Sequence, residues 1–311
     1  MDKNKKWQFK GMLPILPAVV DNNDNVDVKS EKKLVEYCLS NEAQAIGHLA
    51  WASEFAKLTV DDRKIITETL VEAAAKRVPV FIGVTAASSR IAEKYAVQAY
   101  KQGADIIMAA LPYANIPTRN EAYDFYRRLS ESVPIPIIVQ DVAVGKVVLD
   151  VDLLLELHNT FKNICYIKAE DNDFLPKTAE LLKICDDSVV IGGYGGKHML
   201  HMLRLGIKSF MTGTEALDIH NRIVKLYLNG KTEEAAKDYY ARLLPYFVFY
   251  EKFGEELLKK MLFWRKIIDF DGALTPKQKP VMTGIEIDEF KWVLDRIGFF
   301  EHNDVNCAKS N

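Results

Sequence analysis

The chain has 311 residues, of which 49% are hydrophobic and 27% are charged, and its formal net charge at pH 7 is −2. This length and composition are typical of a globular protein with one large core or two smaller ones. Lysine and arginine are interspersed with acidic residues, so we expect no nucleic acid partner.

The N-terminal residues are polar, and no apolar run approaches the roughly 20 residues that cross a membrane. Because the start of the chain also lacks the apolar core of a signal peptide, we expect a cytoplasmic protein without a membrane partner. The cysteines form no CxxC pair, which favours reduced thiols over a disulfide or zinc framework. They are Cys38, Cys165, Cys185 and Cys307. His198 and His201 have no third ligand nearby in sequence, so we predict a helical surface pair and no metal site.

Short apolar runs rich in β-branched residues alternate with longer amphipathic stretches up to residue 211. The runs predict strands at residues 12–16, 45–49, 78–84, 105–110, 136–140, 164–168, 189–192 and 209–211. The stretches between them predict helices at residues 29–39, 60–75, 90–102, 119–130, 150–160, 174–184 and 197–205. Repeated strand–helix units with apolar strands favour an α/β fold, a parallel sheet closed into a (β/α)8 TIM barrel. An open doubly wound sheet is the alternative, although no GxGxxG motif follows the first strand.

Beyond residue 211 the strand pattern ends and helical patterns follow one another. They predict helices at residues 217–228, 232–252, 255–268 and 285–297. We therefore predict three parts: a barrel over 1–215, a C-terminal helical region over 216–300 packed on the barrel or a neighbouring subunit, and a polar, frayed tail over 301–311. The aromatic residues between 239 and 253 are interpreted as helical packing or a subunit interface, without a chemical role.

One lysine, Lys168, lies in the strongly apolar, β-prone run of residues 164–170. Burial lowers the pKa of a lysine by disfavouring the charged form, and a neutral amine can attack a ketone. The alternative is a lysine at a strand end whose stem packs while its head reaches water. The chemistry of a TIM barrel lies at the C-terminal ends of its strands, where Lys168 is placed. We predict that Lys168 forms a Schiff base and that its amine reaches an open cavity.

Five motifs, in their order and spacing, resemble the dihydrodipicolinate synthase / N-acetylneuraminate lyase family of class I aldolases and dehydratases. They lie at residues 13–17, 53–59, 111–113, 135–138 and 166–168. The resemblance runs over nearly the whole chain. It implies a barrel with a C-terminal helical appendage, a lysine on strand six that forms an imine with a 2-oxo acid, and no cofactor. It also implies a homo-oligomer, a tetramer or a dimer.

The loop that holds the substrate carboxylate departs from the family pattern. The usual Gly-Thr-Thr-Gly-Glu sequence reads Ala-Trp-Ala-Ser-Glu at residues 50–54. We expect the main-chain N–H groups of Ala52 and Ser53, together with the Ser53 hydroxyl, to bind the carboxylate. Glu54 is expected to orient this loop, and an ordinary acid preceding a helix is the alternative.

The tyrosine that relays protons in the family is also missing. Its motif, Tyr-Asn-x-Pro, reads Gln140-Asp141-Val142-Ala143, and a second tyrosine is replaced by Ala114. An amide does not titrate in the range that aldol chemistry needs, which weakens the case for synthase activity. We expect Gln140 and Asp141 to bind substrate hydroxyls, and a capping role for Asp141 is the alternative.

Glu170 is the predicted replacement for the missing acid/base. It lies two residues beyond Lys168, on the same face of the strand. After imine formation, one carboxyl at this place can remove the C3 proton and protonate the hydroxyl leaving C4. The alternative is an ion pair that only neutralises Lys168 and raises the pKa of its amine.

Two more strand ends carry candidates. The glycine-rich run at residues 192–196 lets the backbone approach a hydroxylated ligand, or forms a tight turn. We predict that Gly193 and Tyr194 bind substrate, and Tyr194 is a candidate proton relay. Tyr113 is predicted to close one wall of the site or donate a hydrogen bond, with a packed aromatic as the alternative.

These patterns are most similar to the 2-keto-3-deoxy-sugar-acid dehydratase branch of the family, to which L-2-keto-3-deoxyarabonate dehydratase belongs. We predict a cofactor-free Schiff-base lyase that dehydrates such a 2-oxo acid through an imine on Lys168. The alternatives are a pyruvate-dependent aldolase similar to dihydrodipicolinate synthase, and a non-catalytic sugar-acid-binding protein.

Overall fold

The computed structural model describes residues 7–115, 117–142, 149–170, 174–277 and 279–300. The predicted tail at 301–311, Cys307 and Ala143 lie outside these residues. Cys38, Cys165 and Cys185 form no disulfide with one another. None of the helices within the described ranges is long and apolar enough to cross a membrane.

The strands of the described chain form one eight-stranded parallel sheet in the order β1-β8-β7-β6-β5-β4-β3-β2. They are β1 (Gly11–Met12), β2 (Ile46–His48), β3 (Val80–Gly83), β4 (Ile106–Ala109), β5 (Ile137–Asp141), β6 (Ile164–Ala169), β7 (Val190–Gly192) and β8 (Ser209–Phe210). Ile15, just past β1, bridges both Gly47 of β2 and Gly213 beyond β8, which closes the sheet. The predicted barrel is confirmed, and each predicted strand overlaps an observed one.

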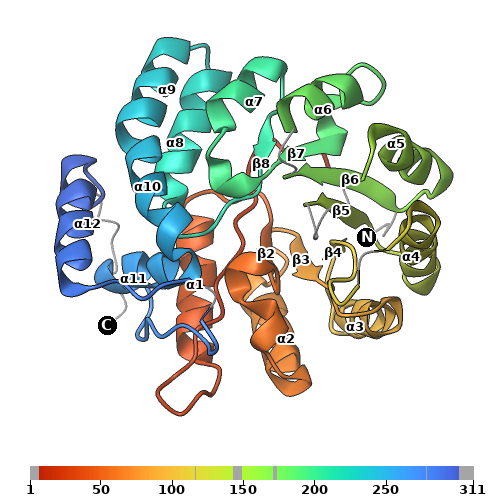
Figure 1. Cartoon of the computed structure of the whole chain (residues 1–311), viewed down its shortest axis with the longest axis horizontal. Helices are drawn as coiled ribbons and strands as arrows, with labels where there is room; N and C mark the ends of the chain where they lie inside the picture. The colour runs from red at the N-terminus through yellow and green to blue at the C-terminus, as the bar shows by residue number, and fades with distance from the viewer. Residues whose placement is uncertain (1–6, 116, 143–148, 171–173, 278, 301–311) are drawn as a thin grey trace.

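Helices surround this barrel in chain order (Figure 1). They are α1 (Val28–Ser40), α2 (Val60–Ala74), α3 (Ser89–Lys101), α4 (Arg119–Ser132), α5 (Val151–Thr160), α6 (Phe174–Leu181), α7 (Met199–Leu205) and α8 (Leu217–Leu228). Helix α2 begins at a capping box in which Thr59 accepts from the Asp62 N–H and the Asp62 side chain accepts from the Thr59 N–H. Thr118 and Glu121 start α4 in the same way. Such boxes satisfy N–H groups that the first helical turn leaves unpaired, which fixes where each helix starts.

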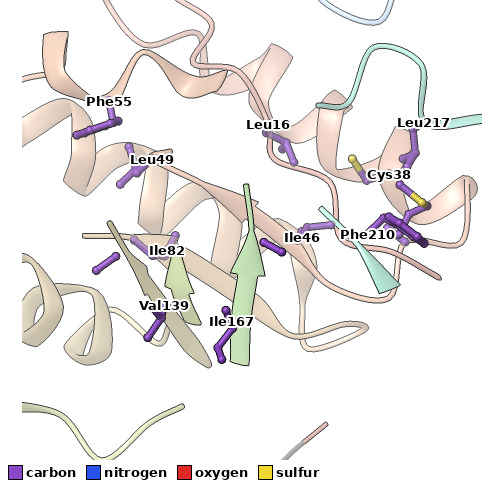
Figure 2. Packing of buried hydrophobic residues seen from close by; sticks show 14 of the residues in the cluster. Leu16, Cys38, Ile46, Leu49, Phe55, Ile82, Val139, Ile167, Phe210 and Leu217 are labelled. Atoms are coloured by element: carbon purple, nitrogen blue, oxygen red, sulfur yellow. The ribbon is translucent and has the colours of Figure 1, made fainter. Parts of the chain in front are cut away.

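Two layers of apolar side chains hold the barrel together, because successive residues of a strand point to opposite faces. The inner layer fills the lumen and includes Leu13, Ile15, Phe81, Met108, Ile138, Ile191 and Met211. The outer layer packs between strands and helices, and Figure 2 shows Ile82, Val139, Ile167 and Phe210 within it. Each such side chain contributes roughly 1.5–3 kcal/mol when fully buried. By the same alternation Gln140 and Lys168, which follow Val139 and Ile167, face the lumen.

The C-terminal helices lie together on one side of the barrel, on the left in Figure 1. They are α9 (Thr232–Asp238), α10 (Leu244–Phe253), α11 (Glu255–Trp264) and α12 (Gly284–Arg296). The single helix predicted over 232–252 is divided by a π-helical turn, Tyr239–Leu243. Pro245 gives the physical reason, since it has no N–H to donate and its ring clashes with the carbonyl four residues earlier in a regular helix.

Helix α8 contacts both β1 and α7 and so completes the ring of helices around the barrel. Helix α9 packs on α8, whereas α11 contacts the 3₁₀ turn Trp51–Ser53 that follows β2. The appended helices therefore reach the C-terminal ends of the strands, which is the end where TIM barrels carry out chemistry. The division of the chain at residue 215 stays a prediction.

Candidate active site

Lys168 and Glu170 form a buried ion pair at the end of β6. Only 3% of the Lys168 surface is exposed, and its Nζ lies 2.8 Å from Oε1 of Glu170. The alternative of a strand-end lysine required the ammonium group to reach bulk water, and the structure shows that it does not. Alternation along the strand places both side chains on the lumen face, and their attraction offsets part of the cost of removing the ammonium from water. The pair provides a nucleophilic nitrogen with a proton acceptor beside it.

Three donors from three strand ends hold the Glu170 carboxylate. Besides Lys168, the Gln140 Nε2 donates to Oε2 at 2.7 Å and the Tyr194 main-chain N–H donates to Oε1 at 3.0 Å. Gly193 makes room for this side chain, because a Cβ at position 193 would lie 2.2 Å from Glu170 Cγ. The structure thus brings Gln140, Lys168, Glu170 and the glycine-rich loop into one group.

Asp141 lies on the other face of β5. Its carboxylate pairs with Lys177 of α6 at 2.7 Å, and both side chains are buried between the barrel and the helix layer. Because neighbouring strand residues point in opposite directions, Gln140 and Asp141 do not both face the lumen. The structure does not bring the Asp141 side chain to the Lys168–Glu170 pair.

Ser53 is occupied within its own loop. Its hydroxyl donates to the Leu16 carbonyl at 2.6 Å, and its main-chain N–H donates to the Ala50 carbonyl at 2.9 Å. These bonds hold the 3₁₀ turn after β2 closed. The hydroxyl and the main-chain N–H of Ser53, which were expected to bind a substrate carboxylate, are therefore already used. Ala52 lies in the same turn and is half-buried.

Glu54 ties this loop to the C-terminal helices. Its carboxylate pairs with Lys57 at 2.7 Å and with the fully buried Lys259 of α11 at 2.5 Å, and it also accepts from the Leu274 N–H. Burial alone would raise the pKa of Glu54, but the two ammonium groups outweigh it and hold the pKa below its ordinary value. The side chain orients the loop through these contacts and turns away from Lys168.

The two tyrosine candidates are partly exposed. Tyr113 is 40% exposed and packs edge-on against Phe55 with ring centroids 5.9 Å apart. Tyr194 is 41% exposed and its ring lies near His198, at 5.6 Å between centroids. The main chain of Tyr194 contacts Glu170, whereas the rings of Tyr194 and Tyr113 pack near His198 and Phe55.

One acid in this region was missed by the sequence reasoning. Glu215 follows β8, is 1% exposed, and accepts a hydrogen bond from the Tyr246 hydroxyl of α10 at 3.2 Å. Burial raises the pKa of Glu215 to about 7, although the bond from Tyr246 opposes the rise. The sequence signal that could have identified Glu215 is an acidic residue a few positions past a predicted strand end. Its partner Tyr246 lies in the aromatic run that was interpreted as packing without a chemical role.

Residues 143–148 and 171–173, which follow β5 and β6, lie outside the described ranges. A cavity of about 770 Å³ opens elsewhere, on the outer face of α2, α3 and α4. Its basic lining residues are Lys64, Arg90, Lys94, Lys101 and Arg128. It does not contain Lys168, so the open cavity expected at that amine is not this one. Within the described chain no group of three or more His, Cys, Asp or Glu is placed to hold a metal ion.

Comparison with known proteins identifies relatives by sequence. The L-2-keto-3-deoxyarabonate dehydratase of Azospirillum brasilense is 27% identical over 249 residues, which cover 78% of this chain and 80% of that protein. The 4-hydroxy-tetrahydrodipicolinate synthase of Bartonella quintana is 31% identical over 162 residues, 51% of this chain and 55% of the synthase. The chain thus matches about half the length of that synthase.

Solved structures share the fold. Dihydrodipicolinate synthase from Aquifex aeolicus superimposes with a TM-score of 0.85 at 22% identity, over 92% of this chain and 97% of that one. YagE, an E. coli K12 prophage protein solved in complex with pyruvate, superimposes with a TM-score of 0.84 at 20% identity, over 93% of this chain and 98% of that one. The model of the dihydrodipicolinate synthetase family matches residues 8–260, which confirms the resemblance drawn from the motifs. The chain therefore belongs to the dihydrodipicolinate synthetase family and is a lyase, an aldolase or a dehydratase.

Proposed function

We propose that this lyase dehydrates a 2-keto-3-deoxy sugar acid through an imine on Lys168. The observation that carries the proposal is the Glu170 carboxylate 2.8 Å from the Lys168 Nζ, with the amide of Gln140 at the place of the relay tyrosine. A dehydratase needs one acid/base near C3 and C4, whereas aldol chemistry needs a group that titrates at the C4 oxygen. The match to the Azospirillum dehydratase, which extends over 78% of the chain, supports the same reading.

The ion pair sets the first step. Glu170 accepts a proton from the Lys168 ammonium, and the neutral amine then attacks the C2 ketone of the substrate. Glu170 returns its proton to the adduct oxygen, which leaves as water, and the protonated imine that results acidifies the C3 hydrogens. Glu170, again a carboxylate, removes a C3 proton, and the electron pair forms an enamine. The enamine electrons then form the C3–C4 double bond as the C4–O bond breaks, and Glu170 gives its proton to the departing oxygen, which leaves as water. Hydrolysis of the imine releases the product and restores Lys168.

Gln140 and Tyr194 position the base during these steps. The Gln140 amide and the Tyr194 N–H both donate to Glu170, so the carboxylate keeps its place when Lys168 becomes bonded to substrate. Holding a base within reach of the reacting atoms removes much of the entropic cost of proton transfer. We assign the 2-oxo acid carboxylate to the turn that contains Ala52, where Ser53 maintains the loop rather than donating to the ligand.

A pyruvate-dependent aldolase or synthase is the second candidate. The 31% identity to the Bartonella synthase favours it, as does the pyruvate bound to YagE. Products separate the two candidates. Dehydration of a 2-keto-3-deoxypentonate yields a semialdehyde without loss of carbon, whereas cleavage releases pyruvate.

Imine formation is tested by adding borohydride in the presence of pyruvate and locating the reduced adduct by peptide mass spectrometry. We expect the adduct on Lys168 and none in Lys168→Met. An unmodified Lys168 in the wild-type protein would remove the Schiff base and the dehydration that depends on it.

The role of Glu170 is tested with Glu170→Gln, which keeps the shape of the side chain but accepts no proton. We expect imine trapping to persist and dehydration to fall by about 100-fold or more, the size of a positioned acid/base. Steady-state product assays measure the second effect. Undiminished turnover in this variant would exclude Glu170 from the reaction.

A further inference from the structure

We propose that Glu215 is a second catalytic carboxyl of this site and gives its proton to the oxygen that leaves C4 of the substrate. This inference rests on the dehydration proposed above. There, Glu170 alone carried out both proton transfers; here they are divided between Glu170 and Glu215.

The backbone places the Glu215 carboxyl in the barrel lumen. Ile15 belongs to the inner apolar layer and pairs in parallel with Gly213, so position 213 also faces the lumen. A Cβ on Gly213 would lie 2.1 Å from Oε2 of Glu215. The glutamate therefore folds back over the strand end, and its carboxyl fills the lumen position that the glycine leaves without a side chain.

The two oxygens of this carboxyl are bonded unequally. Oε1 accepts from Tyr246, whereas Oε2 is buried and has no hydrogen-bond partner among the residues that the structure describes. A buried oxygen without a partner is costly, and a substrate hydroxyl in the lumen would supply one. Since burial raises its pKa to about 7, the carboxyl keeps a proton to donate near neutral pH.

The nearby charged groups leave this acid without a countercharge. The guanidinium of Arg265, directly after α11, lies 3.3 Å from the Glu215 main-chain carbonyl, but it is paired with Asp218 of α8 at 2.7 Å and bonded to Tyr37 of α1. His220 of α8 is fully buried, and burial lowers its pKa to about 4, so the imidazole is neutral.

Tyr250 of α10 packs edge-on against Tyr246, the tyrosine that donates to Glu215, with ring centroids 6.2 Å apart. Burial raises the pKa of its hydroxyl, and the charges of Glu215, Glu255 and Glu170 raise it further. Its ring also contacts the glycine-rich loop, since a Cβ on Gly195 would lie 3.9 Å from Tyr250 Cε1. Glu170 follows β6 and Glu215 follows β8, so the two carboxyls lie at the same end of the parallel barrel.

The chemistry balances with two acids. Glu170 enters as a carboxylate and takes the C3 proton, while Glu215 enters protonated. The enamine electrons form the C3–C4 double bond, the C4–O bond breaks, and the Glu215 proton joins the departing oxygen to make water. Glu170 is then protonated and Glu215 ionised, and exchange with solvent after product release restores both. A carboxylate that takes a proton and a carboxylic acid that gives one suit these opposite roles.

The test compares three readouts in Glu215→Gln: borohydride trapping with pyruvate, deuterium exchange into the pyruvate methyl group, and dehydration of a 2-keto-3-deoxypentonate. Trapping needs Lys168 and exchange needs Lys168 and Glu170, so we expect both readouts within about threefold of the wild type. Dehydration also needs the donated proton, so we expect a loss of about 100-fold or more. Glu215→Asp retains an acid and is expected to dehydrate at least tenfold faster than Glu215→Gln.

Glu255→Gln is the matched control. Glu255 also acts on Tyr250 and its pKa is raised by burial, but it lies on α11 near Lys57 and Lys279 rather than over the lumen. We expect its dehydration rate within about twofold of the wild type. The inference on Glu215 is wrong if Glu215→Gln dehydrates normally, or if all three readouts fall together in both Glu215 variants. A wild-type protein that traps pyruvate but dehydrates no such acid would instead overturn the proposed function itself.

Discussion

Glu170 fits the site because residue 193 has no side chain. In Gly193→Ala the new Cβ would lie 2.2 Å from Glu170 Cγ, closer than real atoms approach, so the carboxylate must move. We expect imine trapping to persist and dehydration to fall by roughly 100-fold, since a displacement of about 1 Å can cost that much. Product assays measure the change.

Gly284→Ala is the control for this substitution. Position 284 begins α12, and nothing lies within 4 Å of its added Cβ. We expect wild-type dehydration in that variant. A Gly193→Ala enzyme as active as Gly284→Ala would show that the observed position of Glu170 is not the reacting one.

The residues of the candidate site differ in how far local pattern could reveal them. Lys168 and Glu170 were predictable together because alternation along one strand fixes their common face. Asp141 shows the converse, since the same alternation separates it from Gln140 and points it toward Lys177. Glu215 could not be inferred from local pattern, because its place in the lumen depends on folding back over Gly213 and on a tyrosine from α10.

At the scale of elements, one buried ion pair joins the loop after β2 to α11. Glu54→Gln leaves the fully buried Lys259 ammonium without its carboxylate partner. We expect a loss of about 3–5 kcal/mol in the free energy of unfolding, measured with denaturant, because an unpaired buried charge is costly. The double variant Glu54→Gln with Lys259→Met should recover part of that loss.

The matched control is Glu42→Gln, which breaks the exposed pair between Glu42 and Lys225. Its cost should stay below about 1 kcal/mol. Because the pKa of Glu54 is lowered on folding, its stabilisation is complete above the ordinary carboxyl pKa of 4.5 and is lost as pH falls below that value. Equal costs for Glu54→Gln and Glu42→Gln at neutral pH would contradict a structural role for the buried pair.

The elements themselves were largely predictable, since apolar runs and helical periodicity mark each strand and helix. Their ends depended on tertiary contacts, as the short β1 and β8 show. The break between α9 and α10 was missed because a helical pattern continues through Pro245, and sequence periodicity does not report a widened turn.

At the scale of the whole molecule, the C-terminal helices contribute side chains that pair with residues of the barrel. They supply Tyr246 to Glu215, Lys259 to Glu54 and Arg265 to Asp218, and each of these acids is on the barrel side. A chain ending after Gly230 would lack all three of these partner side chains. We expect it to lack a cooperative thermal transition and to form no borohydride adduct.

Calorimetry and mass spectrometry of that shortened chain check the expectation. The full-length protein treated in parallel is the reference for both measurements. A shortened protein that melts cooperatively and still traps pyruvate would mean that the helices beyond α8 are dispensable for the site.

The main-chain bond from Tyr194 to Glu170 has a consequence for how this enzyme can diversify. Every amino acid except proline has a peptide N–H at position 194. A substitution there therefore keeps the hydrogen bond to the Glu170 carboxylate. The φ of +56° at this residue still favours glycine, asparagine or aspartate among the replacements. Replacement of the Tyr194 ring by another side chain is therefore expected to leave this bond to Glu170 in place.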